Sequence, residues 1–406
     1  MRVLLLSDFY PPVRGGLEAH VDGLASELVA RNHEVHVATL TTRPVPTDAR
    51  VNTHVAPSLA AKVLPHADPA RPFHPPLPDP ATRRFLRRLV EQVRPDVIHG
   101  HSWMSVSLPQ RLAAPLVFTA HDYAMVCQLR TLLRPDGTRC GGADVRTCIR
   151  CGTAQYGRLA SALLASGSKV GAGRLRPDAV IAVSGAVARA LGPALGRTAQ
   201  VIPNFLPAAA PAAEGQRDWP ERFVMYAGDP GDHKGVPDLL AIWGTSTRPD
   251  ADLVLAVTRD ADRAALPPGV HMARMERADV LEGFRRAAVA VVPSRWDDPC
   301  PTVAFEAMAS GTPIVAGRVG GLVDIVRDEV DGFLVPPGDR VAFATRISAL
   351  LADPALRERM GEAARERARQ FSARHVVGKI IALYAELAEV ATGQPGSAAL
   401  TNARIA

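Results

Sequence analysis

The sequence is poor in aromatic residues and has no apolar run long enough to cross a membrane. Aromatic side chains make up 5% of its residues, and no basic patch interleaves with them as in proteins that stack nucleic-acid bases. Every apolar run falls short of the roughly 18 to 20 residues that span a bilayer. The apolar part of residues 1–12 is too short for a signal peptide. These absences predict a cytoplasmic protein that binds no nucleic acid.

Charge is unevenly distributed along the chain. At 406 residues the chain exceeds what one hydrophobic core usually supports, so we expect two domains of about 200 residues each. Residues 1–200 contain 24 lysines and arginines against 14 acids, whereas residues 201–406 contain 23 against 27. The basic first half is consistent with an acidic ligand, an anionic lipid surface or a solvated basic face.

Apolar, strand-like runs alternate with amphipathic helical segments, which predicts α/β domains with parallel sheets. In the first half the predicted strands cover residues 3–7, 34–40, 96–101, 115–121 and 179–184. In the second half they cover residues 222–228, 252–258, 289–294, 313–317 and 331–336. Doubly wound domains bind ligands at the carboxyl ends of their strands, so the predicted site lies in the cleft between the domains.

Composition also divides the chain into parts. These are, in order, a doubly wound domain at 1–206 with a Cys-rich insertion at about 122–155, a linker at 207–221, a second doubly wound domain at 222–371, a helix at 372–391 and a flexible tail at 392–406. Residues 41–80 are expected to be irregular. Segment 81–95 predicts an amphipathic helix in which Arg83, Arg84, Arg87 and Arg88 stand beside apolar residues. An ordinary exposed helix explains this segment, and peripheral contact with an anionic membrane is the alternative.

Two loops after predicted strands contain glycine beside polar residues. Gly15 and Gly16 follow the first strand and open a long helix, where backbone N–H groups can approach an anion or a sugar. Lys234 precedes Gly235 at the start of a helix in the second half. A cation is unfavourable at that end of a helix dipole, so its place suggests a shared anion. A tight turn and a surface lysine are the simpler alternatives.

A pair of acids flanks the start of a helix in the stretch SRWDDPCPTVAFEAMASG, residues 294–311. A helix is predicted from Thr302 to the C-capping Gly311. Carboxylates repel phosphate but accept hydrogen bonds from hydroxyls, so Asp298 and Glu306 suit a sugar and a ribose on either side of phosphate-binding N–H groups. The spacing indicates a sugar-nucleotide site, and incidental surface acids are the alternative.

Several motifs occur together and in order: GGLEAH, FTAHDY, VIPN, HKG, the Asp298–Glu306 pair, EAMASGTPIVA, GGL and DGFLVPPGD. In this combination residues 1 to about 390 resemble the retaining glycosyltransferases of family 4. The resemblance implies the GT-B fold, two Rossmann-like α/β domains facing across a cleft, with a final helix that crosses back to the first domain. It also implies transfer from a nucleotide-diphosphate sugar, held by the second domain, to a hydroxyl of a glycolipid, polysaccharide precursor or small natural product. No metal ion is implied for catalysis.

By position, His121 and Asp298 resemble the family's residues at the transferred sugar, and Glu306 resembles the acid on the ribose hydroxyls. Gly16 resembles a glycine beside the phosphates, and Lys234 resembles half of a basic pair on the diphosphate. Further candidate donor contacts are Gly15, Cys300, Pro301, Thr302, Gly320 and Gly321, and candidate acceptor contacts are His20, His99 and His101.

The sequence departs from the family pattern in three ways. Asp229 stands where the family usually has arginine, which places a negative charge near a diphosphate unless the side chain points away. Asp298 and Asp324 stand in place of glutamates, so each side chain is shorter by one carbon–carbon bond, roughly 1.5 Å. A Gly-rich turn that usually follows the second strand of the second half is absent. Arg259 or Arg295 could supply the positive charge that is missing at Asp229.

Four of the five cysteines, Cys127, Cys140, Cys148 and Cys151, fall within 25 residues. Their spacing, which ends in C-x2-C, and a reducing compartment favour a structural zinc ion, with reduced thiols or disulfides as alternatives.

Two other functions are compatible with the sequence. One is a non-catalytic or degenerate sugar-nucleotide-binding protein, which the acid at Asp229 would suit. The other is a GT-B epimerase or phosphorylase. The joint presence of His121, Lys234 and Glu306 favours a working site, and the motif set favours transfer.

Overall fold

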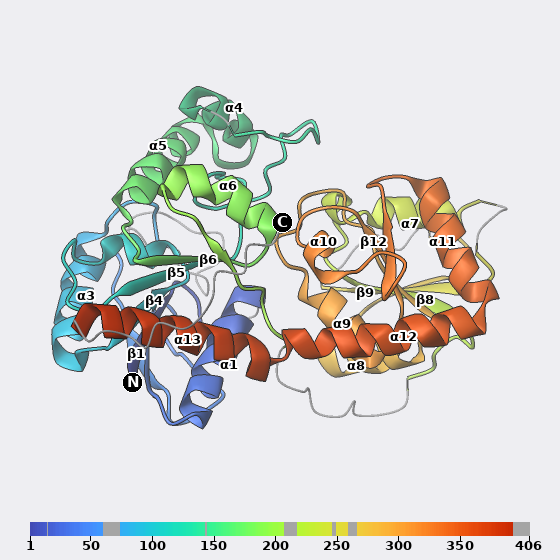
Figure 1. The fold of residues 1–406 in the computed structure, drawn as a ribbon. Helices are drawn as coiled ribbons and strands as arrows, with labels where there is room; N and C mark the ends of the chain where they lie inside the picture. The colour runs from blue at the N-terminus through green and yellow to red at the C-terminus, as the bar shows by residue number, and fades with distance from the viewer. Residues whose placement is uncertain are drawn as a thin grey trace.

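The computed structural model describes residues 1–13, 15–59, 74–142, 144–206, 217–245, 249–258 and 266–392, and it contains one parallel β-sheet in each half of the chain (Figure 1). The first sheet comprises β1 (Arg2–Ser7), β2 (Glu34–Thr39), β3 (Asn52–Val55), β4 (Val97–Gly100), β5 (Leu116–Ala120), β6 (Ala179–Ala182) and β7 (Gln200–Val201). The second comprises β8 (Phe223–Gly228), β9 (Asp252–Val257), β10 (Val270–Arg274), β11 (Val289–Val292), β12 (Ile314–Gly317) and β13 (Gly332–Val335).

The two sheets share one topology. Their strand orders are β3-β2-β1-β4-β5-β6-β7 and β10-β9-β8-β11-β12-β13. Both are Rossmann-like doubly wound orders, and such sheets bind ligands beside the carboxyl ends of the strands at which the order reverses. Those strands are β1 and β4 in the first sheet and β8 and β11 in the second. The predicted α/β fold with two doubly wound domains is therefore confirmed.

Helices follow most of the strands. In the first half they are α1 (Gly16–Ala30), α3 (Pro80–Val93), α4 (Val145–Tyr156), α5 (Arg158–Arg174) and α6 (Gly185–Leu195). In the second half they are α7 (Val236–Trp243), α8 (Arg277–Arg286), α9 (Thr302–Ser310), α10 (Leu322–Ile325), α11 (Arg340–Ala352), α12 (Pro354–Ala368) and α13 (Ala373–Thr392).

Every strand predicted from an apolar run is present with bounds within two residues of the prediction. Such runs form strands because a parallel sheet covered on both faces buries both sides of each strand. All five residues of β5 are buried, for example. Three strands were missed, namely β3, β7 and β10. The residues of β3 are exposed or half-exposed, because pairing with β2 places them at the edge of the sheet. The presence of β3 corrects the prediction that residues 41–80 are wholly irregular.

The final helix, α13, packs against the first half of the chain, although it follows the second sheet. Its residues Val376, Val377, Ile380 and Tyr384 join the core that contains β1 and α1. Figure 1 shows α13 lying along that domain. Residues 207–216 of the predicted linker and residues 393–406 of the predicted tail lie outside the described residues.

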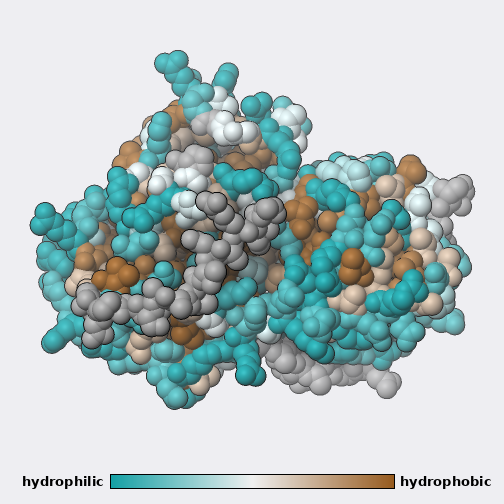
Figure 2. All heavy atoms as spheres, in the orientation of Figure 1, coloured by the Kyte–Doolittle hydropathy of each residue, from teal (hydrophilic) through white to brown (hydrophobic). Residues whose placement is uncertain are grey.

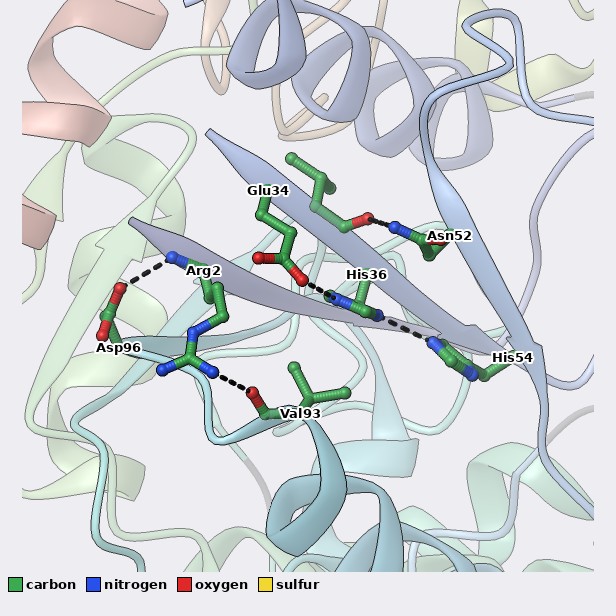
Figure 3. Close-up of polar contacts among 8 residues, drawn as sticks. Arg2, Glu34, His36, Asn52, His54, Val93 and Asp96 are labelled. Atoms are coloured by element: carbon green, nitrogen blue, oxygen red, sulfur yellow. Dashed lines mark hydrogen bonds and ion pairs between the residues drawn. The ribbon is translucent and has the colours of Figure 1, made fainter. Parts of the chain in front are cut away.

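Polar side chains join the strands of the first sheet at its amino edge, away from the cleft (Figure 3). The backbone N–H of Arg2 donates to Asp96 Oδ2 over 2.7 Å, which links the starts of β1 and β4. His36 Nδ1 and His54 Nε2 lie 2.9 Å apart, and His36 Nε2 lies 3.0 Å from Glu34 Oε1. These two histidines therefore form contacts within the sheet.

The helix α3 buries the apolar side that could have entered a membrane. Leu86, Leu89 and Val93 belong to the first domain's core, and only the arginine-rich side is exposed. Among the described helices, none is long and apolar enough to span a bilayer.

Candidate active site

The loop after β1 is tied to the loop after β4 at the reversal point of the first sheet. Ser102 Oγ donates to Asp8 Oδ1 over 2.6 Å. In the same loop, a Cβ on Gly15 would lie 2.2 Å from the Glu18 carboxylate, so a side chain there would displace Glu18. A Cβ on Gly16 would meet no described atom within 4 Å, so no close packing requires a glycine there.

Three imidazoles converge at the same edge of the sheet. Ring nitrogens of His20, His101 and His121 all lie within 4.8 Å of one another, and no other group of described residues brings three or more potential metal ligands together in this way. His101 Nδ1 and His121 Nε2 are 3.0 Å apart, whereas neither ring nitrogen of His20 has a hydrogen-bond partner among the described residues. Burial lowers the pKa of all three, that of His121 to about 4. At pH 7 they are neutral, and each can donate and accept hydrogen bonds with hydroxyls.

His99, another predicted acceptor contact, lies deeper than these three. It is fully buried, and its ring nitrogens bind the Tyr384 hydroxyl of α13 and Thr119 Oγ1, the latter at 2.7 Å. Because both nitrogens already have internal partners, His99 anchors α13 to the sheet and is not available to an acceptor.

In the second half, Asp298 forms an ion pair with Lys234. Lys234 Nζ donates to Asp298 Oδ2 over 2.5 Å, and Ser294 Oγ donates to the same oxygen over 3.3 Å. The two side chains are 24% and 6% exposed, and the ammonium lies 5.3 Å from the centroid of the Trp296 ring. An ammonium has three N–H donors, so Lys234 can bind Asp298 and an anion at once. The structure thus joins two residues that the sequence assigned separately to the sugar and the diphosphate.

The helix α9 begins at Thr302 and ends at Ser310, and Gly311 forms its C-cap with a φ of 79°, as predicted. Pro301 at the N-cap has no side-chain oxygen, and no side chain caps the first turn. The preceding Cys300 is packed in the core. Glu306 Oε1 accepts a hydrogen bond from Arg277 Nε of α8 over 2.8 Å. Sequence patterns missed Arg277, because it lies 29 residues away and only the packing of α8 on α9 brings it to Glu306.

Gly320 and Gly321 make their close approach to the protein's own backbone. Gly320 has a φ of 54°, and a Cβ there would lie 2.3 Å from the carbonyl oxygen of Asp298. A Cβ on Gly321 would lie 2.3 Å from the carbonyl oxygen of Pro299, and its N–H donates to Asp298 O over 2.7 Å. These glycines therefore position the loop that carries Asp298, and their donor contacts stay a prediction.

Arg295 is also engaged within the protein. Its guanidinium binds both oxygens of Asp238, and Arg340 Nε donates to Asp238 Oδ1 over 2.7 Å. This pairing raises the pKa of Arg295 and ties the Trp296 loop to α7. The other predicted source of charge, Arg259, lies outside the described residues.

The two remaining aspartates that depart from the family pattern have internal partners. Asp229 Oδ1 accepts from the Gly231 N–H over 2.8 Å, which engages the carboxylate within its own loop. Asp324 Oδ2 accepts from the Gly185 N–H at the start of α6 over 2.7 Å. Asp324 therefore bridges the two domains.

Loops of the two sheets meet across the cleft at the predicted site. The rings of Tyr123, in the loop that begins with His121, and Trp296 pack edge to face with centroids 6.4 Å apart. Arg139 forms an ion pair with Asp297, which precedes Asp298. A cavity of about 970 Å³ opens beside Asp297 and is otherwise lined by the first half of the chain.

The four clustered cysteines have free, half-buried thiols. Cys148 and Cys151 lie on α4, and burial, together with the neighbouring cysteines, raises the pKa of Cys148 to about 11. The structure therefore contradicts the disulfide alternative. Their thiols influence one another but are not among the described groups whose potential ligand atoms converge, in contrast to the histidines.

Comparison with known proteins identifies the family. The model of glycosyltransferase family 4 matches residues 14–209, and the model of glycosyl transferases group 1 matches residues 217–367. The chain belongs to glycosyltransferase family 4. It is a glycosyltransferase.

Relatives agree with this assignment. The chain is 28% identical to a glycogen synthase of Mycobacterium tuberculosis H37Rv over 404 residues, covering 90% of each protein. It is 29% identical to a D-inositol 3-phosphate glycosyltransferase of Saccharomonospora viridis over 406 residues, covering 92% of this chain and 89% of the relative.

Solved structures show the same fold. Sucrose-phosphate synthase of Thermosynechococcus elongatus has a TM-score of 0.70 and 23% identity, covering 95% of this chain and 98% of that one. Anabaena HepE in complex with UDP-glucose has a TM-score of 0.61 and 17% identity, covering 95% and 100%. These similarities confirm the GT-B fold of this glycosyltransferase.

Proposed function

We propose that this glycosyltransferase moves a sugar from a nucleotide-diphosphate sugar to a hydroxyl-bearing acceptor, with retention of configuration and without a catalytic metal ion. The observation that carries the proposal is the meeting of two loops across the cleft. One begins with the neutral His121, and the other holds Asp298 in its ion pair with Lys234.

The second half of the chain would hold the donor. Glu306, fixed by Arg277, accepts hydrogen bonds from the ribose hydroxyls. Lys234 and the uncapped N–H groups of α9 bind the diphosphate, because a helix N-terminus and a cation both favour negative charge. The structures of HepE with UDP and with UDP-glucose support this kind of donor for a protein of the same fold.

The chemistry is a same-face substitution. The acceptor oxygen bonds to the anomeric carbon on the face from which the bond to the diphosphate oxygen breaks, and the acceptor proton passes to that leaving oxygen. A carboxylate nucleophile, as used by retaining glycosidases, is then unnecessary. His121 and Asp298 orient the sugar through hydrogen bonds to its hydroxyls, and the low pKa of His121 keeps the imidazole neutral for this task.

A panel of UDP-, GDP-, dTDP- and ADP-sugars, incubated with hydroxyl acceptors and analysed by mass spectrometry and NMR, tests this function. We expect one donor class to give a product with the anomeric configuration of the donor, and a chelator to leave the rate unchanged. Inverted products would refute retention. Loss of activity with a chelator, restored by a divalent metal, would refute metal independence and direct attention to the three converging histidines.

A structural zinc ion in the Cys-rich segment remains part of the proposal. Four cysteines supply the donor types of a structural zinc site, and zinc binding would have to bring together sulfur atoms that do not converge in the described residues. Metal analysis of the purified protein should find one zinc per chain, lost in the Cys148→Ser variant. A metal-free, fully folded wild-type protein would leave the reduced thiols as the correct alternative.

A further inference from the structure

The helices α4 and α5 carry positive charge without any acid among them. Between Val145 and Pro177 the sequence has six cations and no aspartate or glutamate. The cations are Arg146, Arg150, Arg158, Lys169, Arg174 and Arg176. Arg174 binds the Val106 carbonyl oxygen, but no side-chain hydrogen bond or ion pair links Arg146, Arg150, Arg158 or Lys169 to other described residues. This segment therefore presents uncompensated charge to its surroundings.

The outer side of α5 is apolar as well as basic. Leu159, Leu163 and Val170 are 76%, 60% and 58% exposed. At 100° per residue they fall within a 40° sector of the helix, so they form one apolar stripe. Figure 2 shows hydrophobic residues among hydrophilic ones over α4 and α5, which project from the rest of the domain. Exposed leucines aligned on a basic helix are typical of surfaces that contact anionic lipid.

The opposite side of α5 lines the cavity of about 970 Å³ beside Asp297. One wall is formed by α5 and α6 and includes Ala165, Ala172 and Ala186, and the other is formed by residues of the 125–142 segment and α4, among them Met125 and Leu132. Three cations and one acid also line the cavity, namely Lys169, Arg189, Arg139 and Asp297. The ion pair with Arg139 occupies Asp297, which leaves Lys169 and Arg189 as cations for a ligand. A cavity of this size fits a small ligand, and its lining suits an apolar body that bears a negative group.

On the helical wheel, Lys169 lies between the apolar stripe and the cavity wall, so one helix joins the outer surface to the cavity. We infer that α4 and α5 dock on an anionic membrane and that the cavity receives the phosphate-bearing head of a lipid-linked acceptor. The phosphate lies among Lys169 and Arg189, and the lipid chain leaves along the stripe of α5. The acceptor sugar then reaches the Asp297–Asp298 loop. This inference rests on the proposed transferase function and names its acceptor class.

The helix α3 offers a matched comparison. Arg84 and Arg88 are exposed on it, as are Arg150 and Arg158 on α4 and α5. Its apolar side chains are buried in the core, however, and it does not line the cavity. Positive charge alone would make both surfaces equal, whereas the inference assigns lipid binding to α5.

Vesicle co-sedimentation of the full chain tests the surface. Vesicles of phosphatidylcholine with phosphatidylglycerol should bind the protein, and vesicles of phosphatidylcholine alone should bind it far less. Arg150→Ala/Arg158→Ala should weaken binding by about fivefold for each cation removed, and Leu159→Ser/Leu163→Ser should also weaken it. Arg84→Ala/Arg88→Ala is the matched control and should change it less than twofold. Equal effects of the α3 and α5 variants, or equal binding to neutral vesicles, would overturn the docking surface.

Binding of soluble probes tests the cavity. Farnesyl phosphate should bind at least tenfold more tightly than farnesol, a difference of about one charged hydrogen bond. It should also bind at least tenfold more tightly than inorganic phosphate, which lacks the apolar chain. Lys169→Ala/Arg189→Ala should remove this preference. Equal binding of farnesol would overturn the phosphate contact, and equal binding of inorganic phosphate would overturn the lipid-linked source. Nucleoside diphosphate binding, measured on the same samples, should be unchanged in every variant. Its absence from the wild type would instead refute the donor site.

Discussion

The two halves of this glycosyltransferase have the same sheet topology but opposite chemistry where they face each other. In the first half, the carboxyl edge of the sheet is formed by neutral imidazoles, His20, His101 and His121, whose pKa values are lowered by burial. In the second half it is formed by ion pairs, Lys234 with Asp298 and Arg277 with Glu306. Side chains after equivalent strands, rather than the fold, therefore decide what each half binds.

The difference fits the two substrates of a transferase. A nucleotide diphosphate carries fixed charge and needs fixed counter-charge, whereas a hydroxyl group needs partners that can both donate and accept. This assignment of the substrates to the two halves would be wrong if donor binding did not need the ion pairs or if the histidines were charged.

Lys234→Ala should have the largest effect. It removes a cation from the diphosphate and leaves the nearly buried Asp298 without its counter-ion, so donor affinity should fall about a hundredfold and the unfolding free energy by about 3 kcal/mol. Calorimetric titration with the donor nucleotide and chemical denaturation measure both. Arg285→Ala, which breaks an exposed pair on α8, is the control and should change neither. Undiminished donor affinity would contradict the phosphate assignment.

Lowering the pH should destabilise the protein through the neutral histidines of the first half. His20, His101 and His121 have folded-state pKa values below their usual 6.5, that of His121 about 4, so the unfolded chain binds more protons between these limits. The unfolding free energy should be constant above about pH 6.5 and fall as the pH drops, by up to about 1.4 kcal/mol per unit for each histidine.

Replacing one histidine isolates its part in this effect. His20 packs on Phe205 with ring centroids 4.6 Å apart, so phenylalanine fits its surroundings. Denaturation of His20→Phe between pH 5 and pH 7 should show a shallower loss than the wild type. An unchanged slope would mean that His20 is not held neutral.

Glu306→Gln should have a smaller effect on the donor. The amide keeps the shape but weakens the bonds to the ribose and leaves Arg277 without its ion pair, so donor affinity should fall about tenfold. Glu282→Gln on α8, whose partners Arg285 and Arg286 are exposed, is the matched control and should leave affinity unchanged. Equal affinities of both variants would remove Glu306 from the ribose site.

Asp324→Ala should have the smallest effect. It tests whether Asp324 joins the two halves or contacts the donor. The carboxylate accepts from the Gly185 N–H, so its loss should cost about 1 kcal/mol of stability and leave donor affinity within twofold. A tenfold loss of donor affinity would instead show that Asp324 contacts the donor.

Local sequence carried most of the fold. Continuous apolar runs marked the buried strands, and Gly311 marked the end of α9, because these features act over a few neighbouring residues. The edge strand β3 lacked such a run and was missed. Lys234, Asp298 and Glu306 could be chosen from motif spacing for the same reason.

The tertiary partners of the site residues could not be predicted from the sequence. Arg277 reaches Glu306 only through the packing of α8 on α9, and Asp324 reaches Gly185 only when the domains meet. The roles of Gly320 and Gly321 depend on a loop folded back onto them. Each of these contacts is tertiary, and spacing along the chain contains no trace of it.

Hydrogen exchange of the full chain, with and without the nucleoside diphosphate that binds most tightly, tests whether the charged second half holds the donor. The nucleotide should protect residues 228–236 and 294–310 of the second half and leave residues 99–107 and 116–123 of the first half nearly unchanged. Protection confined to the first half would contradict the assignment of the donor to the charged side of the cleft.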